Sequence, residues 1–296
     1  MDMTDRVVPA VTAEAERYRP RLFGIAYRML ADVHDAEDLV QETYLRWHQA
    51  EQSTVASPEA WLVAVITRLA IDRLRRAETE RLQYVGTWLP EPLATSADAP
   101  DRRIDLSSDL SMAFLVLLER LSPDERAAFL LREAFDAGYD EIAGVLDKTE
   151  VAVRQMVHRA KARVREGRPR FTAGRRAQHA LLVRFLDALA ADDKDAMLAL
   201  FASDATFMSD GGGKVPAARR ILEGPERIAR FLLGFGRKYG GRVTYEIVEL
   251  NGQPAIVSYF EGAIAAATSY ETDGTRITAV YRVLNPDKLR GLRKFP

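Results

Sequence analysis

A helix-turn-helix pattern between residues 138 and 165 constrains this chain more than any other feature. Apolar residues recur at i, i+3, i+4 and i+7 from Tyr139 to Leu146, and the same spacing resumes from Val153 to Val164 after the break Asp147-Lys148-Thr149. Two amphipathic helices joined by a short turn form a helix-turn-helix, the unit whose second helix enters the major groove of DNA. The pattern therefore predicts a DNA-binding element.

The second of these helices carries the hydrogen-bond donors that a DNA reader needs. Its long polar side chains lie opposite the apolar stripe, where Arg and Gln can bond base edges and basic residues can contact phosphates. The residues expected to contact DNA are Thr149, Glu150, Val153, Arg154, Gln155, His158, Arg159 and Lys161. The alternative is an ordinary solvated helix, because charged outer faces are common.

Composition excludes several kinds of site. Lys plus Arg (42) nearly balance Asp plus Glu (43), so any contact with nucleic acid must come from a local basic patch. The chain has no cysteine and only 4 scattered histidines, so we expect no disulfide, no metal site and no cofactor. The start, MDMTDRVVPA, lacks the features of a signal peptide, and no apolar run is long enough to span a membrane. We expect a cytoplasmic protein with no membrane partner.

The first part of the chain, from about residue 17 to 81, predicts a helical module. One helix is expected to start near Pro20, a second to be capped by Asp35, and a third to begin at Ser57-Pro58 and end in the basic run RLRR. The second helix has an acidic start, so an acidic helix is expected beside a basic one.

The order of these motifs is more specific than any one of them. The segments DAEDLVQETYLRWH, SPEAWLVAVITRLAIDRLRR and LSPDERAAFLLREAFDAGYDEIAGVLDKTEVAVRQMVHRAKARVRE follow one another between residues 17 and 168. In that order they resemble the extracytoplasmic-function (ECF) sigma factors. The resemblance implies two all-α domains, region 2 at 1–81 and a region 4 helix-turn-helix at 112–168. It also implies a transcription initiation factor rather than an enzyme.

The resemblance assigns the second helix to RNA polymerase core. Its residues are implied to dock on the β′ clamp helices, and the β flap is the other contact on core that the resemblance implies. The residues expected in this interface are Asp35, Glu37, Asp38, Gln41, Glu42, Arg46 and Trp47. A polar face with a large aromatic side chain suits a specific protein interface. The alternative is that Tyr44 and Trp47 pack inside their own module.

The two promoter elements are implied to be read by two different helices. By resemblance, the second helix of the helix-turn-helix reads the minus-35 element, and the third helix captures the opened minus-10 strand. Capture needs unstacked bases held in shaped pockets beside a basic track. The residues available for it are Trp61, Arg68, Asp72, Arg73, Arg75 and Arg76. Arg68 stands where many relatives carry Asn, so the base pocket is expected to differ, and Trp61 has the alternative of a core position.

Residues 82–111 predict a linker that contains an unusual apolar island, YVGTWLPEPL. The island resembles a linker motif of sigma factors fused to a SnoaL-like domain. A Trp-Leu pair set between prolines is preorganised, so it loses less entropy on docking. We expect Trp88, Leu89, Pro90, Glu91 and Pro92 to dock on another domain or to enter the polymerase. The alternative is a loop that covers the core of its own neighbour.

A different kind of domain follows a basic hinge at 169–176. Helices are expected at Ala177–Ala191, Ala196–Phe201 and Pro225–Lys238, with a strand at Ala205–Asp210. Four strand-like runs then alternate with NG, EG and DG turn signals. Helices followed by a meander of strands predict an α+β cone, one curved sheet wrapped on helices. This order resembles the SnoaL-like, NTF2-type fold over 177–296.

Two loops of this domain are implied by resemblance to be regulatory contacts with the sigma domains. The residues are Asp210, Gly211, Gly212, Gly213, Lys214, Asn285, Pro286, Asp287 and Lys288. The segment NGQPA at Asn251–Ala255 joins them, although turn chemistry explains its Asn-Gly pair by itself. The consecutive glycine amides and Lys214 also offer a place for an anion. The cone is expected to hold or release the arrangement of the helical domains, which is a population shift.

Two rival functions come from other classes. A one-component transcriptional regulator would use the same helix-turn-helix but would not need the two region 2 helices. A fused enzyme or small-molecule-binding domain would need convergent side chains in the cone, for which Asp204, Asp210, Tyr245, Tyr259 and Glu261 are the candidates. No histidine or cysteine lies in the sheet region, and a pocket argued from the fold is analogy only.

Overall fold

The computed structural model describes residues 16–81, 83–95, 109–167 and 174–292, and the chain forms two compact units. Unit 1 comprises Met1–Arg75, Asp101–Ser108 and Leu121–Lys161, and unit 2 comprises Arg76–Pro100, Asp109–Arg120 and Ala162–Pro296. Parts of the predicted linker (82 and 96–108) and most of the predicted hinge (169–173) lie outside the described residues. None of the described helices is long and apolar enough to cross a lipid bilayer.

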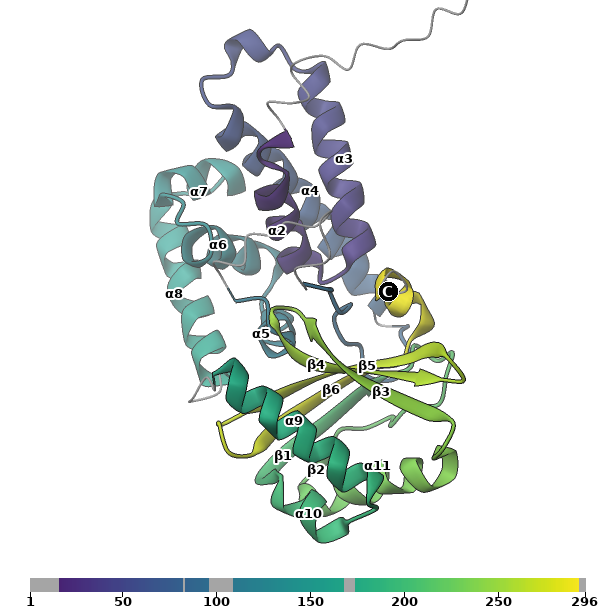
Figure 1. The fold of residues 1–296 in the computed structure, drawn as a ribbon. Helices are drawn as coiled ribbons and strands as arrows, with labels where there is room; N and C mark the ends of the chain where they lie inside the picture. The colour runs from purple at the N-terminus through teal and green to yellow at the C-terminus, as the bar shows by residue number, and fades with distance from the viewer. Residues whose placement is uncertain (1–15, 82, 96–108, 168–173, 293–296) are drawn as a thin grey trace, which may run out of the picture. The chain divides into compact units, whose positions relative to one another are not determined.

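Unit 1 begins with the helical module that the sequence predicts (Figure 1). Its helices are α2 (Arg19–Leu30), α3 (Val33–Gln49) and α4 (Pro58–Arg81), with the short 3-10 helix η1 (Gln52–Thr54) between the last two. The last turns of α4, from Arg76, belong to unit 2. The prediction that Asp35 caps α3 is wrong by one turn. Asp32 is the N-cap, because its carboxylate accepts the backbone N–H of Asp35 at 2.9 Å. Asp35 lies inside the first turn, where its charge still favours the helix dipole.

Helix α6 (Pro123–Glu133) packs on α2, and the two helical modules share one compact unit. Its predicted capping box is present, because Ser122 and Glu125 satisfy each other's backbone amides. Arg126 reaches across with its guanidinium donating to the Met29 carbonyl at 2.6 Å. Arg28 is fully buried beneath the ring of Phe135, 5.5 Å from its centroid. Buried arginines of this kind bring fixed hydrogen-bond geometry to an otherwise apolar contact.

The helix-turn-helix consists of α7 (Tyr139–Leu146) and α8 (Glu150–Gly167). Helix α7 ends at Asp147, whose φ of 53° is left-handed and turns the chain, and the Lys148 N–H closes the end on the Ala143 carbonyl. The apolar stripe predicted on α8 is buried from Val153 to Val164. The predicted break at Asp147-Lys148-Thr149 is thus confirmed.

Unit 2 contains a six-stranded sheet with three helices on one face, which we call the helix-covered face (Figure 1). These helices are α9 (Arg175–Ala190), α10 (Lys194–Ala199) and α11 (Pro225–Tyr239), and the last described element is the 3-10 helix η2 (Pro286–Leu292). The strands are β1 (Phe201–Asp210), β2 (Leu222–Glu223), β3 (Val243–Leu250), β4 (Gln253–Phe260), β5 (Ala263–Thr272) and β6 (Ile277–Val283). Their order is β2-β1-β6-β5-β4-β3, and only the β1–β6 pair is parallel among these strands. The α+β prediction is confirmed.

Each face of this sheet carries its own hydrophobic core. One core lies under α9, α10 and α11 and includes Phe185 and Phe207. The other core lies on the opposite face and includes Leu89 of the linker and Met112 of helix α5 (Met112–Leu118). Side chains on a strand alternate between faces, so the sheet is apolar on both. Helix α5 opens the predicted second helical domain, yet the structure places it in unit 2 with the sheet.

Candidate functional site

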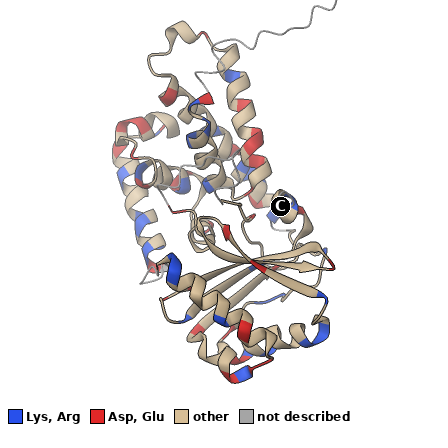
Figure 2. Cartoon of the chain, in the orientation of Figure 1, with Lys and Arg blue, Asp and Glu red and all other residues tan. Residues whose placement is uncertain are grey.

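Lys and Arg recur along α8 (Figure 2), and the polar side chains opposite its apolar stripe are exposed. The exposed members of the predicted DNA-contacting set are Thr149, Glu150, Arg154, Gln155, His158, Arg159 and Lys161. Val153 must be removed from that set, because its side chain is completely buried and supports α8 from inside. Val151 was missed, and it is 66% exposed at the start of the helix. An exposed valine at that position can contact a thymine methyl group in the major groove.

Several of the basic side chains on α8 are already paired with acids inside unit 1. Arg154 bonds Glu150 at 3.1 Å and lies over the Tyr139 ring, 4.2 Å from its centroid. Lys161 pairs with Glu133 at 2.8 Å. Exposed pairs of this kind contribute little to stability, so they can exchange an acid for a phosphate at small cost.

The predicted minus-10 residues on α4 make contacts that no sequence pattern reveals. Arg68 donates to the backbone carbonyls of Gly144 and Val145, at 2.8 and 2.9 Å, and so ties α4 to the C-terminal end of α7. Arg75 pairs with Asp124 at 2.8 Å, at the first turn of α6. In this arrangement both arginines join α4 to the helices of the second module. Asp72 and Arg76 are exposed on the same helix.

Two residues predicted for different partners pair with each other. The Arg73 guanidinium donates to both carboxylate oxygens of Asp35, at 3.1 and 2.5 Å, and this bidentate pair fixes α4 against α3. Trp61 is half-buried with its ring 5.2 Å from that of Trp47, which is only 6% exposed. The structure therefore fits the alternative that Trp47 packs inside its own helical module.

The residues of α3 that were predicted to bind polymerase core and remain exposed form a polar strip along the helix. Asp38 and Gln41 are exposed, and Glu42 bonds Arg46 at 2.9 Å. Glu37 pairs with Arg19. Leu45 was missed by the sequence analysis, and its side chain is 57% exposed between these polar residues. An apolar anchor inside a polar rim is the usual make-up of an interface centre.

An enclosed cluster of polar side chains lies in unit 2 and surrounds Asp210 at the end of β1. Asp210 is fully buried, and its carboxylate accepts hydrogen bonds from the Tyr84 hydroxyl at 2.5 Å and the Leu89 N–H at 3.0 Å. The Gly212 N–H and the Lys288 ammonium complete the set at 2.9 and 2.7 Å. Burial and the adjacent Asp210 carboxylate raise the pKa of Tyr84, so its hydroxyl remains a donor. We call these contacts the Asp210 cluster.

Lys288 holds the linker from the other side of this cluster. Its ammonium donates to the Leu89 carbonyl at 2.5 Å as well as to Asp210, and only 8% of the residue is exposed. The Trp88 ring contacts two cations, with Lys288 Nζ 4.1 Å and Arg81 Cζ 3.7 Å from its centroid. The linker is therefore fixed by hydrogen bonds, an ion pair and cation–π contacts together.

The rest of the linker island is also buried on unit 2. Pro90, Glu91 and Pro92 are buried. The Leu93 N–H donates to the Asn251 side chain at 3.0 Å, and its carbonyl accepts the Asn251 N–H at 2.7 Å. Asn251 has a φ of 52°, as the Asn-Gly turn between β3 and β4 requires. The turn and the linker contact are thus made by the same residue.

The glycine loop, Asp210–Lys214, is shaped by the segment Asn285–Leu289. Gly212 has a φ of 60°, and a side chain there would collide with the amide of Asn285, so both geometry and space require glycine. Asn285 donates to the Tyr84 hydroxyl at 2.9 Å. Lys214 is ion-paired with Asp287, next to Pro286 at the start of η2. The loop therefore closes on the Asp210 cluster.

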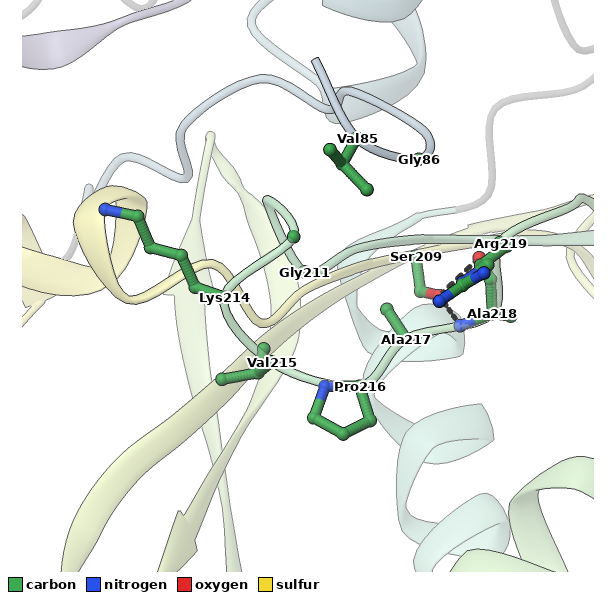
Figure 3. Close-up of a pocket in the computed structure, with 11 residues that line it drawn as sticks. Val85, Gly86, Ser209, Gly211, Lys214, Val215, Pro216, Ala217, Ala218 and Arg219 are labelled. Carbon is green, nitrogen blue, oxygen red and sulfur yellow. Dashed lines mark hydrogen bonds between the residues drawn. The ribbon is translucent and has the colours of Figure 1, made fainter.

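A cavity of about 380 Å³ lies between the glycine loop and the linker (Figure 3). Val85 and Gly86 form one wall, and Ser209 with the loop as far as Arg219 forms the other. Figure 3 shows Lys214 extending away from Ser209 and Arg219, so the two cations do not converge. The predicted anion site at Lys214 finds no support in this geometry, because that ammonium is already paired.

The candidate acid-base residues of the cone do not converge either. Asp204 is exposed, and Glu261 lies in an exposed turn paired with Arg242. Tyr259 donates to Glu246 at 2.7 Å. The Asp210 carboxylate is occupied by the linker, as described above. Tyr245 is half-buried on the helix-covered face, apart from these groups.

Three family descriptions match successive parts of the chain. Sigma-70 region 2 matches residues 15–80, Sigma-70 region 4 matches 111–164, and the SnoaL-like domain matches 182–289. The chain is 36% identical over 295 residues to the ECF RNA polymerase sigma factor SigJ of Mycobacterium tuberculosis H37Rv, covering 94% of this chain and 93% of that protein. It is 29% identical over 290 residues to the probable ECF RNA polymerase sigma factor SigI of the same species, covering 96% of each.

The fold also matches a solved structure. The crystal structure of Mycobacterium tuberculosis SigJ superposes with a TM-score of 0.78 at 35% identity, covering 95% of this chain and 98% of that one. The similarity therefore extends over the two helical modules, the linker and the cone.

Proposed function

We propose that this chain, which belongs to the ECF RNA polymerase sigma factors, binds RNA polymerase core in the cytoplasm and directs transcription initiation at its promoters. In this proposal α8 reads the minus-35 element and α4 captures the minus-10 strand. The support on unit 1 is the exposed polar and basic face of α8, with its apolar stripe buried. Such a face serves both base edges and phosphates.

The contact with core is proposed for the exposed strip of α3. Asp38, Gln41, Glu42 and Arg46 form its polar part, and Leu45 lies among them as the apolar anchor. The β′ clamp helices are the proposed partner of this strip, and the β flap is the second proposed contact on core. Trp47 is left out of the direct contacts, because it packs inward on Trp61.

The cone is proposed to regulate the sigma domains through the linker and α5. The observation that carries this proposal is the Asp210 cluster, which holds Tyr84 and Leu89 with a buried ion pair. Helix α5, at the start of the region 4 match, packs into the same sheet core through Met112 and Ala113. Both ends of the connection between the sigma regions are thus held by the cone. A state with the linker docked and one with it released would place region 4 differently.

The test compares the full chain with a full-length Lys288→Met variant, because the linker and α5 share a core with the sheet and a truncation would expose it. Core binding and abortive transcription from the promoter upstream of the protein's own gene are measured for both. We expect the wild type to bind core and yield transcript, and the variant to yield a different amount of transcript per bound complex. No core binding by the wild type would refute the sigma proposal. Equal transcription by a variant whose linker is measurably loosened would refute the regulatory one.

A further inference from the structure

Arg282 of β6 occupies an unusual position on the helix-covered face of the sheet. Val280, two residues before it, belongs to the core under the helices, whereas Tyr281 and Val283 belong to the core on the linker side. Because side chains alternate along a strand, Arg282 shares the face of Val280. Its neighbours in register are Ser209 on β1 and Thr268 on β5.

This guanidinium is buried without an opposite charge. Arg282 is 8% exposed, and among the described residues no carboxylate forms an ion pair with it and no side chain or carbonyl accepts a hydrogen bond from it. Arginine is almost never buried unless it is paired, because removing a cation from water is costly. The buried arginines of unit 1 follow that rule, since Arg126 donates to the Met29 carbonyl. Arg282 departs from it.

The groups around Arg282 are aromatic and hydroxylic rather than acidic. The Phe235 ring of α11 lies 4.9 Å from the guanidinium carbon. The titratable groups that act on Arg282 are the phenols of Tyr270 and Tyr245, and burial raises the pKa of both, so they stay neutral. Burial lowers the pKa of Arg282 itself, but an arginine in a protein keeps its charge. A cation–π contact with Phe235 offsets only part of the lost hydration.

Solvent still reaches the guanidinium. Among the described residues, the side-chain atoms that are both inaccessible to solvent and without a hydrogen-bond partner are Arg21 Nε and Thr67 Oγ1, and neither belongs to Arg282. A buried, unpaired nitrogen with no accessible surface would belong to that group. The Arg282 guanidinium therefore keeps a small accessible surface, in keeping with the 8% exposure of the residue.

We propose that Arg282 anchors a binding site in the cone for a small organic carboxylate with an aromatic or similarly apolar body. The planar fork of donors matches a carboxylate in a bidentate pair. The rings of Phe235, Tyr245 and Tyr270 would contact the apolar body, and the Thr268 hydroxyl is a further polar group on the same face. Inorganic phosphate fits less well, because it has no apolar body for the aromatic rings to contact.

The test uses the full-length chain and three probes. Benzoate carries the proposed features, benzamide has the same shape without the charge, and inorganic phosphate has charge without the apolar body. Calorimetry and thermal unfolding are measured for the wild type, for Arg282→Met, and for Arg276→Met as a matched control at an exposed arginine near the start of the same strand. We expect saturable benzoate binding to the wild type and to the control, at least tenfold weaker binding of benzamide and phosphate, and no measurable benzoate binding to Arg282→Met.

Stability without a probe separates a binding residue from a structural one. A buried, unpaired charge destabilises the protein when no ligand is bound, so Arg282→Met is expected to unfold at a higher temperature than the wild type. The benzoate-induced rise in unfolding temperature is expected in the wild type and the control and absent in this variant. A lower unfolding temperature for Arg282→Met, equal binding of benzamide and benzoate, or no saturable benzoate binding would each overturn the proposal.

Discussion

Replacing Lys288 by methionine is expected to release the linker from the cone. The change removes the only cation that pairs with the buried Asp210 carboxylate in the described part of the chain, and it removes a hydrogen bond to the Leu89 carbonyl. Removing one partner of a buried ion pair costs about 3–5 kcal/mol. The Tyr84 hydroxyl and the N–H groups of Leu89 and Gly212 still donate to Asp210, so we take the lower end, about 3 kcal/mol.

Hydrogen exchange of the Leu89 amide measures this loss directly. That N–H donates to Asp210, so its exchange requires local opening of the docked linker. A reduction of about 3 kcal/mol in the opening free energy corresponds to exchange roughly a hundredfold faster, because about 1.4 kcal/mol is a factor of ten. Methionine retains the length of the side chain, so packing on Trp88 is largely kept.

Two further variants control for non-specific effects. Lys214→Met breaks the exposed pair with Asp287, which is expected to contribute less than about 1 kcal/mol and to change Leu89 exchange by less than about fivefold. Asp210→Asn combined with Lys288→Met removes both charges and is expected to exchange more slowly than Lys288→Met alone. A Lys288→Met effect below threefold, or one equal to that of Lys214→Met, would refute the role assigned to the buried pair.

Three other outcomes follow from the structure. Leu45→Glu should weaken binding to polymerase core at least tenfold without changing the unfolding temperature, whereas Val183→Glu, at another exposed position, should leave core binding unchanged. Burial raises the pKa of Glu271 from 4.5 to about 7. The folded chain therefore holds this proton more tightly than the unfolded chain, and stability falls as pH rises from 4.5 to 7. Thermal unfolding should show Glu271→Gln to be more stable than the wild type at pH 8, by up to about 3 kcal/mol, and similar to it near pH 5. Arg68→Gln removes two hydrogen bonds to the end of α7, which together contribute about 1–3 kcal/mol. Spin labels on α4 and α7 should then report a broader distance distribution than in the wild type. An unchanged distribution would contradict the role of Arg68 in tying α4 to α7.

Local patterns predicted those parts of the fold that depend on neighbours in the chain. The apolar stripe from Val153 to Val164 and the capping box at Ser122 follow from spacings of three and four residues, and both are present. Each of the four strand-like runs became a strand, because alternation and turn residues act over a few positions. The predicted helix Ala196–Phe201 ran too far, since Phe201 begins β1 and pairs with Ile277 of β6.

Contacts between distant residues could not be read from spacing. Asp35 and Arg73 have ordinary surroundings in the sequence, and only the packing of α3 on α4 makes them partners. The same holds for Arg68, whose acceptors are backbone carbonyls on α7. The linker motif was found through resemblance, but its partner Asp210 became evident only where the sheet brings the two together. Carbonyl acceptors and buried ion pairs leave no periodic signal in a sequence.

The two faces of the sheet connect the two proposals for unit 2. Tyr281 and Val283 of β6 pack towards the linker and α5, while Val280 and Arg282, which alternate with them along the strand, lie on the helix-covered face. A carboxylate bound at Arg282 would therefore act one residue away from side chains that hold the linker side of the core. Coupling between the two faces requires that the ligand bind the linker-docked and the linker-released states with different affinities. Any such coupling is reciprocal, so the factor by which benzoate changes linker opening must equal the factor by which opening changes benzoate affinity. A Lys288→Met protein that opens its linker yet binds benzoate as the wild type does would show that the cone holds two independent sites.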